Sequence, residues 1–229
     1  MARAKALVAW SSGKDAAWAL HLVRQEARVE PVGLLVTITE PYQRSSMHGV
    51  RRELVEAQAR AIGLPLVPVL IPAPCSNEAY ESAMAEAMAR ARAEGVSHVV
   101  FGDIFLADVR AYREDKLAPC GIRPLFPLWG RNTRALLAEM LADGLRARVT
   151  CLDPRVAPRE MAGRELDEAF LASLPEGVDP CGERGEFHTF AFAGPMFGRP
   201  IEVEVGETVE REGFVFTDLI PAVARRGAK

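Results

Sequence analysis

The residues of this sequence best suited to chemistry form a turn of small residues near its beginning, between an apolar run and a segment of helical period. The turn consists of Ser11, Ser12, Gly13, Lys14 and Asp15. A helix that begins near Lys14 directs unpaired backbone N–H groups and the positive end of its dipole toward the turn, which favours phosphate binding. The hydroxyls and the glycine backbone can cradle an anion, the lysine can neutralise it, and the aspartate can hold a divalent metal ion. We therefore expect a nucleotide polyphosphate to bind here.

Two well-known phosphate loops do not match this turn. A Walker loop requires Ser or Thr after Gly-Lys, whereas Asp15 follows Gly13-Lys14, and the Gly-x-Gly-x-x-Gly pattern of dinucleotide sites is absent here. Lysine is rare in this sequence and occurs only at positions 5, 14, 116 and 229. A lysine in the turn is therefore not expected from composition alone, which favours a specific role for Lys14. The alternative is an ordinary strand-to-helix turn with a solvated lysine.

A second concentration of reactive side chains lies late in the chain, in a loop rich in glycine. It spans residues 179–189 and contains Asp179, Glu183, Arg184, Gly185, Glu186, Phe187, His188 and Thr189. Glu183 and Glu186 can bind a cation, to which Phe187 can offer an aromatic face. His188 can move protons. A solvent-exposed connector is the alternative, but apolar neighbours of His188 and Thr189 indicate the start of a rigid strand.

The elements that position these groups alternate, up to about residue 150, between short apolar runs and segments of helical period. The runs predict strands over residues 7–10, 31–38, 66–71, 98–101 and 124–128. The intervening segments predict a helix from Lys14, one after His48 that ends at Gly63, one from an Asn77 cap to Gly95, and one from a Thr133 cap to Gly144. This alternation is typical of an α/β fold with a parallel, doubly wound sheet.

The pattern changes beyond residue 150. It predicts a helix over residues 163–174 and strands over 190–193, 201–205 and 214–216, with a hairpin turn at Gly194-Pro195. We therefore expect a nucleotide-binding domain over residues 1–150 and a smaller α+β domain over residues 151–229.

Polar residues follow three of the predicted parallel strands. Ligands of such sheets bind outside the carboxyl ends of the strands, at the point where strand order reverses. We expect one crevice to be lined by Trp10 and residues 11–15, Thr37 and Ile38, and Gly102 and Asp103. Gly102 can let a sugar approach the backbone, although Gly102-Asp103 by itself is also typical of a turn.

Three further side chains are candidates for the same crevice. Arg110 and Arg113 follow the fourth predicted strand and can clamp a phosphate or carboxylate. The charged segment 108–114 is equally compatible with a solvated helix face. His48 lies at the expected start of a helix, near the nucleotide.

Composition disfavours several classes of protein. The 229 residues are 49% hydrophobic with a formal net charge of -3, and the pI is near 5.9, which argues against a broad nucleic-acid surface. The apolar run near the start is too short for a signal peptide, and no stretch approaches a membrane span. Four cysteines without a Cys-x-x-Cys pair indicate neither zinc nor redox chemistry. We expect a cytoplasmic protein.

The two motifs together resemble those of a known family. That family shows Ser-Gly-Gly-Lys-Asp-Ser near its start and Gly-Glu-Asn-Gly-Glu-Phe/Tyr-His-Thr near its end. This chain has Ser-Ser-Gly-Lys-Asp-Ala at 11–16, Gly-Asp-Ile at 102–104 and Gly-Glu-Arg-Gly-Glu-Phe-His-Thr at 182–189. On these motifs the chain resembles the diphthine ammonia ligases, a branch of the N-type ATP pyrophosphatases. Ser12, Ala16 and Arg184 depart from the family pattern.

The resemblance implies an ATP-binding domain of the adenine nucleotide alpha hydrolase type and a C-terminal part that receives the substrate. It also implies a reaction, in which a substrate carboxylate attacks the α-phosphorus of ATP, pyrophosphate leaves, and ammonia displaces AMP from the acyl adenylate. In the family the acceptor is diphthine, a modified histidine with a quaternary ammonium group.

Roles for individual residues follow from the motifs and this resemblance together. Catalytic roles are expected for Lys14, Asp15, Glu186 and His188, with Mg2+ held by Asp15. ATP is expected at Trp10, Ser11, Ser12, Gly13, Lys14, Asp15, Thr37, Ile38, Gly102 and Asp103. Substrate is expected at His48, Arg110, Arg113, Glu183, Gly185, Glu186, Phe187, His188 and Thr189.

Other functions stay open at this point. The same activation chemistry can serve a different carboxylate, in keeping with the three departures and with a loop at 41–48 that differs from the Ser-Tyr-Met form of the family. A tRNA-modifying relative is disfavoured by the acidic pI and the lack of paired cysteines. A nucleotide-binding sensor without turnover is the third alternative. The sequence is also compatible with a homo-oligomer.

Overall fold

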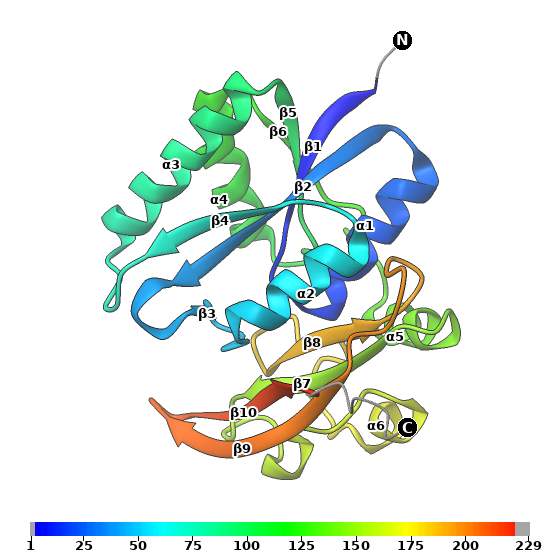
Figure 1. Cartoon of the computed structure of the whole chain (residues 1–229). Helices are drawn as coiled ribbons and strands as arrows, with labels where there is room; N and C mark the ends of the chain where they lie inside the picture. Colours follow the sequence, from blue (N-terminus) through cyan, green and yellow to red (C-terminus); the bar gives the residue numbers. More distant parts are fainter. Residues whose placement is uncertain (1–2, 223–229) are drawn as a thin grey trace, which may run out of the picture.

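The computed structural model describes residues 3–222, which form two sheets with flanking helices (Figure 1). The strands of the first sheet are β1 (Ala4–Ala9), β2 (Val29–Thr39), β3 (Arg44–Ser45), β4 (Leu66–Ile71), β5 (Val96–Val100) and β6 (Arg123–Leu125). Its helices are α1 (Lys14–Glu26), α2 (Arg52–Ile62), α3 (Asn77–Ala93) and α4 (Ala107–Leu117). Short 3-10 helices cover Glu40–Tyr42, Ala118–Cys120 and Arg159–Met161.

The parallel strands of the first sheet lie in the order β4-β2-β1-β5-β6, and β3 pairs antiparallel with the end of β2. The chain winds outward from β1 through β2 and β4, returns, and winds the other way through β5 and β6. The predicted doubly wound parallel sheet is therefore confirmed. Strand order reverses between β1 and β5, so the carboxyl ends of these two strands are the expected edge for a ligand.

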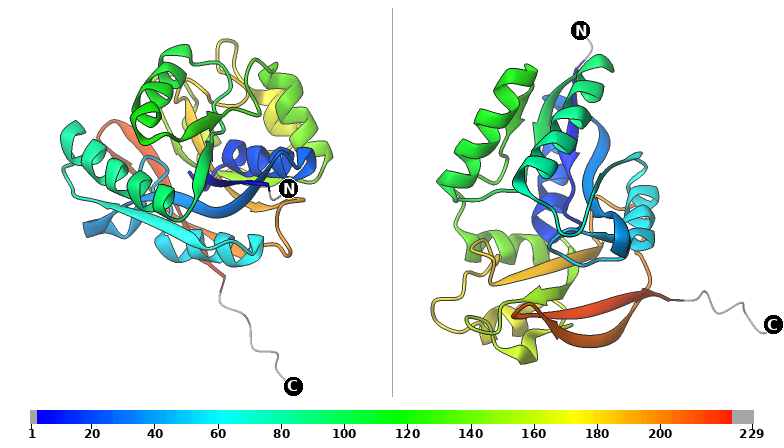
Figure 2. Two further views of the ribbon diagram at one scale, coloured as in Figure 1. Left: turned by 90° about the horizontal axis from the view of Figure 1, so that it is seen from above. Right: turned by 90° about the vertical axis from the view of Figure 1, so that its left-hand side faces the viewer.

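Helices cover both faces of this sheet because its strands are apolar on both faces. Strand β2 buries the consecutive residues Leu34, Leu35 and Val36, as expected for a strand covered on both sides. One face packs against α1 and α2, and the other packs against α3 and α4 (Figure 2). Each such buried side chain contributes about 1.5–3 kcal/mol.

The second sheet belongs to the C-terminal part and consists of antiparallel neighbours in the order β8-β7-β10-β9. Its strands are β7 (Arg146–Leu152), β8 (Phe187–Ala193), β9 (Val203–Arg211) and β10 (Phe214–Pro221), and helices α5 (Thr133–Ala142) and α6 (Glu168–Ser173) accompany them. This confirms the smaller α+β part. Trp18 of α1 and Phe190 of β8 belong to one continuous core, so the two parts pack together.

The division into domains at residue 150 stays a prediction. Residue 150 lies within β7, and the outer limits at residues 1 and 229 lie outside the described residues. Within residues 3–222, no helix is long and apolar enough to cross a membrane.

Two predictions for the C-terminal part are wrong. The Gly194-Pro195 turn does not close a hairpin, because β8 pairs with β7 while β9 pairs with β10. The helix predicted over 163–174 is limited to α6, since residues before Asp167 run beside β7, where Leu166 N donates to Ala147 O. Strand β7, which sequence reasoning did not identify, is the reason for both differences.

Two predicted helix caps are displaced by one residue. Ser76 caps α3 by accepting a hydrogen bond from Ala79 N, and Asn132 caps α5 by accepting one from Ala135 N. Asn77 and Thr133, the predicted caps, are the first helical residues instead. In both helices the residue before the predicted cap is itself a good capping residue.

Candidate active site

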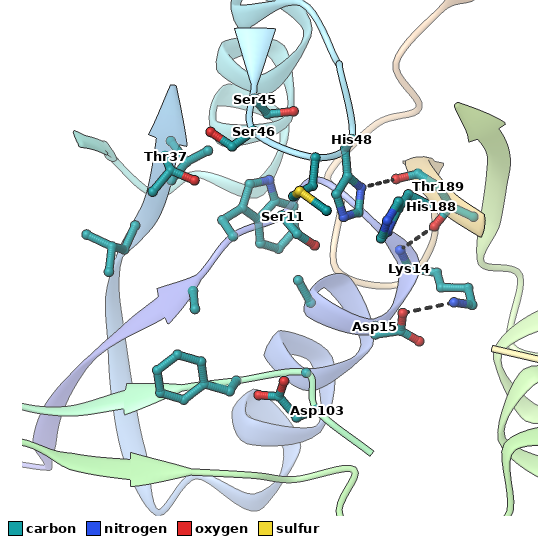
Figure 3. Close-up of a pocket in the computed structure, with 18 of the residues that line it drawn as sticks. Ser11, Lys14, Asp15, Thr37, Ser45, Ser46, His48, Asp103, His188 and Thr189 are labelled. Carbon is teal, nitrogen blue, oxygen red and sulfur yellow. Dashed lines mark hydrogen bonds and ion pairs between the residues drawn. The ribbon is translucent and has the colours of Figure 1, made fainter. Parts of the chain in front are cut away.

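A cleft opens where β1 and β5 end, and segment 181–189 contributes to its wall (Figure 3). Its volume is about 480 Å³. The predicted site residues that line it are Trp10, Ser11, Lys14, Asp15, Thr37, His48, Gly102, Asp103, Arg113, Glu183, Phe187, His188 and Thr189. The turn at the start of α1 and the late glycine-containing loop, far apart in the sequence, therefore meet in one cleft.

Lys14 is the buried cation of this cleft. The residue is 1% exposed, its Nζ lies 2.8 Å from Asp15 Oδ2, and Nζ also donates a hydrogen bond to Cys181 O. Burial by itself lowers the pKa of Lys14, but the Asp15 carboxylate and other nearby anionic groups outweigh it and hold the pKa above its usual value. A positive charge therefore lies at the beginning of α1 at neutral pH.

The turn before α1 is held by contacts from outside it. Ser12 has a φ of 72°, in the left-handed region that favours the glycine of the family pattern. Its carbonyl oxygen accepts hydrogen bonds from Ala191 N at 2.9 Å and from Gln58 Nε2 at 2.9 Å. Gln58 is fully buried, and its Oε1 accepts a hydrogen bond from Trp10 Nε1 at 2.8 Å. Gln58, which the sequence analysis did not identify, thus fixes both sides of the turn.

The first turn of α1 is completed by the C-terminal part. Thr189 Oγ1 accepts a hydrogen bond from Lys14 N at 3.1 Å, so a residue of β8 replaces a local side-chain cap. A Cβ on Gly13 would lie 2.9 Å from His48 Cε1 and 3.1 Å from Thr189 O. Close packing against His48 and Thr189 therefore favours glycine at this position.

Asp15 fits the predicted role of metal ligand. Its Oδ2 pairs with Lys14, whereas its Oδ1 is buried without a hydrogen-bond partner among residues 3–222. Mg2+ is commonly bound through one or two carboxylates together with substrate phosphates. The free oxygen of Asp15, beside the start of α1, is suited to that arrangement. No cluster of three or more His, Cys, Asp or Glu residues in the described chain could hold a metal without a substrate.

Two neutral imidazoles lie together at the cleft. The rings of His48 and His188 have centroids 4.7 Å apart, and His48 Nδ1 lies 2.9 Å from Thr189 O. Because a carbonyl oxygen can only accept, Nδ1 of His48 carries the proton. Burial, reinforced by His188 and Lys14, lowers the pKa of His48 to about 3. Burial and Lys14 lower the pKa of His188 to about 4, so both rings are uncharged at neutral pH.

Glu183 is the carboxylate of the late motif that reaches the cleft. Its Oε1 accepts hydrogen bonds from Ile104 N at 2.7 Å and Phe105 N at 3.3 Å. Burial, helped by the negative charges of Asp15 and Asp103 and opposed by the two N–H groups, raises the pKa of Glu183 to about 7. Glu183 can therefore gain or lose a proton near neutral pH.

The raised pKa of Glu183 predicts a pH effect on stability. The folded protein binds this proton more tightly than the unfolded chain, so its contribution to stability is fully present below about pH 4.5 and is lost as pH rises through about 7. Urea unfolding in metal-free buffer should show that the free energy of unfolding of the parent protein falls relative to that of Glu183→Gln as pH rises from 5 to 8. The exposed Glu176→Gln serves as control. Equal pH dependence in parent and Glu183→Gln would contradict the prediction.

The end of β5 presents an ion pair to the cleft. Arg113 pairs with Asp103: Nη2 donates a hydrogen bond to Oδ1 at 3.0 Å, and Nε lies 2.8 Å from Oδ2 in an ion pair. The guanidinium also lies 4.4 Å from the centroid of the Phe101 ring. Arg113 is thus already partnered, and its use as a phosphate or carboxylate clamp stays a prediction.

Gly102 packs directly against the start of α1, which predicts a large effect of a single methyl group. A Cβ at this position would lie 2.8 Å from Asp15 C and 2.9 Å from Ala16 N, so backbone must move. We expect Gly102→Ala to lower the free energy of unfolding by about 1–3 kcal/mol, measured by urea denaturation. Gly63→Ala is the control. A Cβ at position 63 would have no neighbouring atom within 4 Å, but the φ of Gly63 is 76°, so this variant measures the cost of the left-handed backbone conformation alone. A smaller loss for Gly102→Ala than for Gly63→Ala would refute the packing argument.

Six predicted site residues lie outside the cleft lining: Ser12, Gly13, Ile38, Arg110, Gly185 and Glu186. Glu186 is 5% exposed, and its two carboxylate oxygens accept hydrogen bonds from Asp179 N and Arg184 N, at 3.0 and 2.9 Å. Arg110 lies over the rings of Phe126 and Trp129. Glu186 thus shapes the loop that presents Glu183. The Glu186 side chain does not line the cleft, so its catalytic role stays a prediction.

Some cleft residues were not identified from the sequence. They are Ala9, Ala16, Leu35, Val36, Ser45, Ser46, Met47, Tyr80, Met84, Phe101, Cys181 and Gly182. The polar Ser45-Ser46 pair, close to the candidate residue His48 in the sequence, could have indicated that residues 45–47 belong to the site. Tyr80 and Met84 are four residues apart in α3, a spacing that is also typical of the buried face of a helix.

Comparison with known proteins accounts for both parts of the chain. The diphthamide synthase N-terminal domain matches residues 4–124, and the diphthamide synthase C-terminal domain matches residues 132–220. The chain belongs to the diphthamide synthase family. The resemblance predicted from the two motifs is therefore confirmed.

Similar proteins carry the name diphthine–ammonia ligase. The protein of Danio rerio is 37% identical over 112 residues, which cover 45% of this chain and 43% of the relative. The protein of Homo sapiens is 34% identical over 124 residues, which cover 51% of this chain and 45% of the relative. The protein of Bos taurus is 32% identical over 130 residues, which cover 54% of this chain and 48% of the relative. The matched region thus spans about half the length of these relatives. The diphthamide synthase assignment rests on the two domain matches, which together cover most of the chain.

Proposed function

We propose that this protein is an ATP-dependent, amide-forming ligase of diphthamide biosynthesis, which adenylates a carboxylate and transfers ammonia to it. The observation that best supports the proposal is the buried ammonium group of Lys14 at the start of α1, at the reversal point of a doubly wound sheet. The names of the similar ligases support the same reaction class.

The proposed first step is attack of a carboxylate oxygen on the α-phosphorus of ATP, which forms an acyl adenylate and releases pyrophosphate. Negative charge develops on the leaving pyrophosphate, and the Lys14 ammonium and the N–H groups of the first turn of α1 are placed to stabilise it. Asp15 Oδ1 would hold Mg2+, which supplies further charge neutralisation when bound.

The proposed second step is attack of ammonia on the acyl carbon, with release of AMP. The attacking nitrogen must lose a proton to a base. Glu183, with a pKa of about 7, is better matched to neutral pH than His188, with a pKa of about 4. We therefore assign proton acceptance to Glu183 and leave His188 as a neutral contact for substrate.

The proposed acceptor is diphthine on a protein. Among the acidic groups of the late motif, Glu183 faces the cleft and Glu186 does not, so Glu183 is the group that can approach a quaternary ammonium. The ring of Phe187 already faces Lys14 Nζ at 5.5 Å and is only 1% exposed, so it is a poor second site for that cation. A different carboxylate acceptor remains the alternative within the same reaction.

Product identification tests the reaction class. The protein would be incubated with Mg-ATP and ammonium, with and without a desalted cell extract as source of acceptor, and nucleotides would be separated by chromatography. AMP and pyrophosphate that depend on the extract support the ligase and provide an assay for purifying the acceptor. ADP and phosphate would overturn the proposal, and tight binding of unreacted ATP would favour a nucleotide sensor.

The remaining expectations concern the surroundings of the protein. We propose that it acts in the cytoplasm, as the sequence predicts, and that it does not require nucleic acid. Cell fractionation tests the location, and light scattering of the purified chain tests for a homo-oligomer.

A further inference from the structure

A closed loop carries four residues to the cleft. We call residues 44–51 the His48 loop. Its ends pair with each other through Arg44 and Arg51, and Ser45 N donates to Val50 O at 2.8 Å. Between these ends, Ser45, Ser46, Met47 and His48 line the cleft. The start of the loop is also held by the first sheet, since β3 pairs with β2 and Ser46 N donates to Thr37 O at 3.1 Å.

Asp218 of β10 holds both ends of the His48 loop. Asp218 Oδ1 lies 2.8 Å from Arg44 Nη1 and 3.1 Å from Arg51 Nε, and Oδ2 lies 2.7 Å from Arg51 Nη2. The Asp218 side chain is 20% exposed. Phe216, also in β10, packs against the loop, since a Cβ on Gly49 would lie 3.1 Å from its ring. Asp218 itself does not line the cleft.

The loop reaches the site through His48. Its ring contacts Thr189 O, the ring of His188 and the backbone of Gly13. Thr189 in turn caps α1 at Lys14 N. A displacement of the His48 loop would therefore remove one wall of the cleft and one contact of the turn that begins α1.

We propose that Asp218 is a positioning residue, which fixes the His48 loop through Arg44 and Arg51 and thereby holds His48 against Thr189 at the cleft. A carboxylate is needed because both of its oxygens accept from guanidinium groups. An asparagine keeps one acceptor but turns an NH2 group toward a guanidinium. The contact thus links the C-terminal sheet to the cleft formed by the first sheet. Its effect on catalysis rests on the proposed function, whereas its effect on the loop does not.

The test compares Asp218→Asn with a matched control, Glu165→Gln. Glu165 also lies between two arginines, with Oε1 2.7 Å from Arg146 Nε and Oε2 3.0 Å from Arg148 Nη2. Its side chain is 23% exposed, close to that of Asp218, and it does not line the cleft. Both substitutions remove one carboxylate from between two arginines. A difference between the two variants therefore shows the effect of releasing the His48 loop.

The first readout needs no substrate. The chain has four histidines, so NMR titration can follow each imidazole in the parent protein and both variants. The ring of His48 is buried and faces His188, Lys14 and Thr189 O, so we expect it to stay uncharged between pH 5 and 8 in the parent protein. In Asp218→Asn we expect His48 to titrate closer to its ordinary pKa and trypsin to cleave faster after Arg44 and Arg51. Glu165→Gln should leave both unchanged.

The second readout is AMP formation. We expect kcat/KM to fall about tenfold or more in Asp218→Asn, because small displacements of positioning groups are costly, and to change less than about twofold in Glu165→Gln. An unchanged His48 titration and unchanged cleavage in Asp218→Asn would overturn the proposal. A released loop in a protein that never forms AMP would leave the loop assignment intact and count against the proposed function instead.

Discussion

Replacement of Lys14 by methionine should abolish formation of AMP. Methionine keeps much of the length of the side chain but removes the only buried ammonium among the described residues of the cleft. Loss of one preorganised charge at a site of developing negative charge costs about a hundredfold to a thousandfold in rate. The measurement is AMP release from Mg-ATP in the presence of acceptor extract and ammonium.

The control for this experiment is Lys116→Met. Lys116 also pairs with a carboxylate, Glu81, at 2.9 Å, but its side chain is 44% exposed and lies outside the cleft lining. Because Lys14→Met also leaves Asp15 and Cys181 O without a partner, its thermal unfolding must be recorded. Lys14→Arg, which keeps the charge, gives a second comparison. A folded Lys14→Met protein with normal AMP release would remove the main support for the proposed function.

Replacement of Asp15 by asparagine should produce a loss of similar size, with a different dependence on metal. Asparagine preserves the volume and a carbonyl acceptor for Lys14 Nζ, now 2.8 Å from Oδ2. It removes the negative charge that would hold Mg2+ through Oδ1. We expect AMP release to fall by about a hundredfold or more, with a higher Mg2+ concentration needed for what remains. Chelation of the metal should abolish the reaction of the parent protein.

Asp108→Asn is the matched control for Asp15. Asp108 also lies in the first turn of a helix, α4, but it is exposed and does not line the cleft. The pair of variants also separates ligase from sensor. A ligase loses AMP formation in Asp15→Asn, whereas a sensor changes only the affinity for nucleotide. Equal Mg2+ dependence of the parent protein and Asp15→Asn would exclude Asp15 as the metal ligand.

The late motif illustrates how residues of one segment acquire different tasks. Glu183 and Glu186 are both acidic and only three residues apart, and the sequence assigned both to substrate. In the structure Glu183 binds the N–H groups of Ile104 and Phe105 at the cleft, whereas Glu186 binds N–H groups of its own loop. Which carboxylate faces the cleft depends on how the loop folds, and spacing alone does not decide it.

The sequence by itself determined the class of fold and the location of the cleft. Apolar runs alternating with helical segments are local patterns, and they predict strands and helices without knowledge of distant contacts. The reversal of strand order then places Lys14, Asp15 and Gly102 at one edge of the sheet. The helix start at Lys14 also follows from local residues.

Only the tertiary structure decided how the site is held together. Thr189 caps α1 from 175 residues away, and Gln58 and Ala191 fix the carbonyl of Ser12. Asp218 binds the ends of the His48 loop across a similar span of sequence. These hydrogen bonds join groups whose partners are chosen by packing of the two sheets, and no local period or motif specifies such partners.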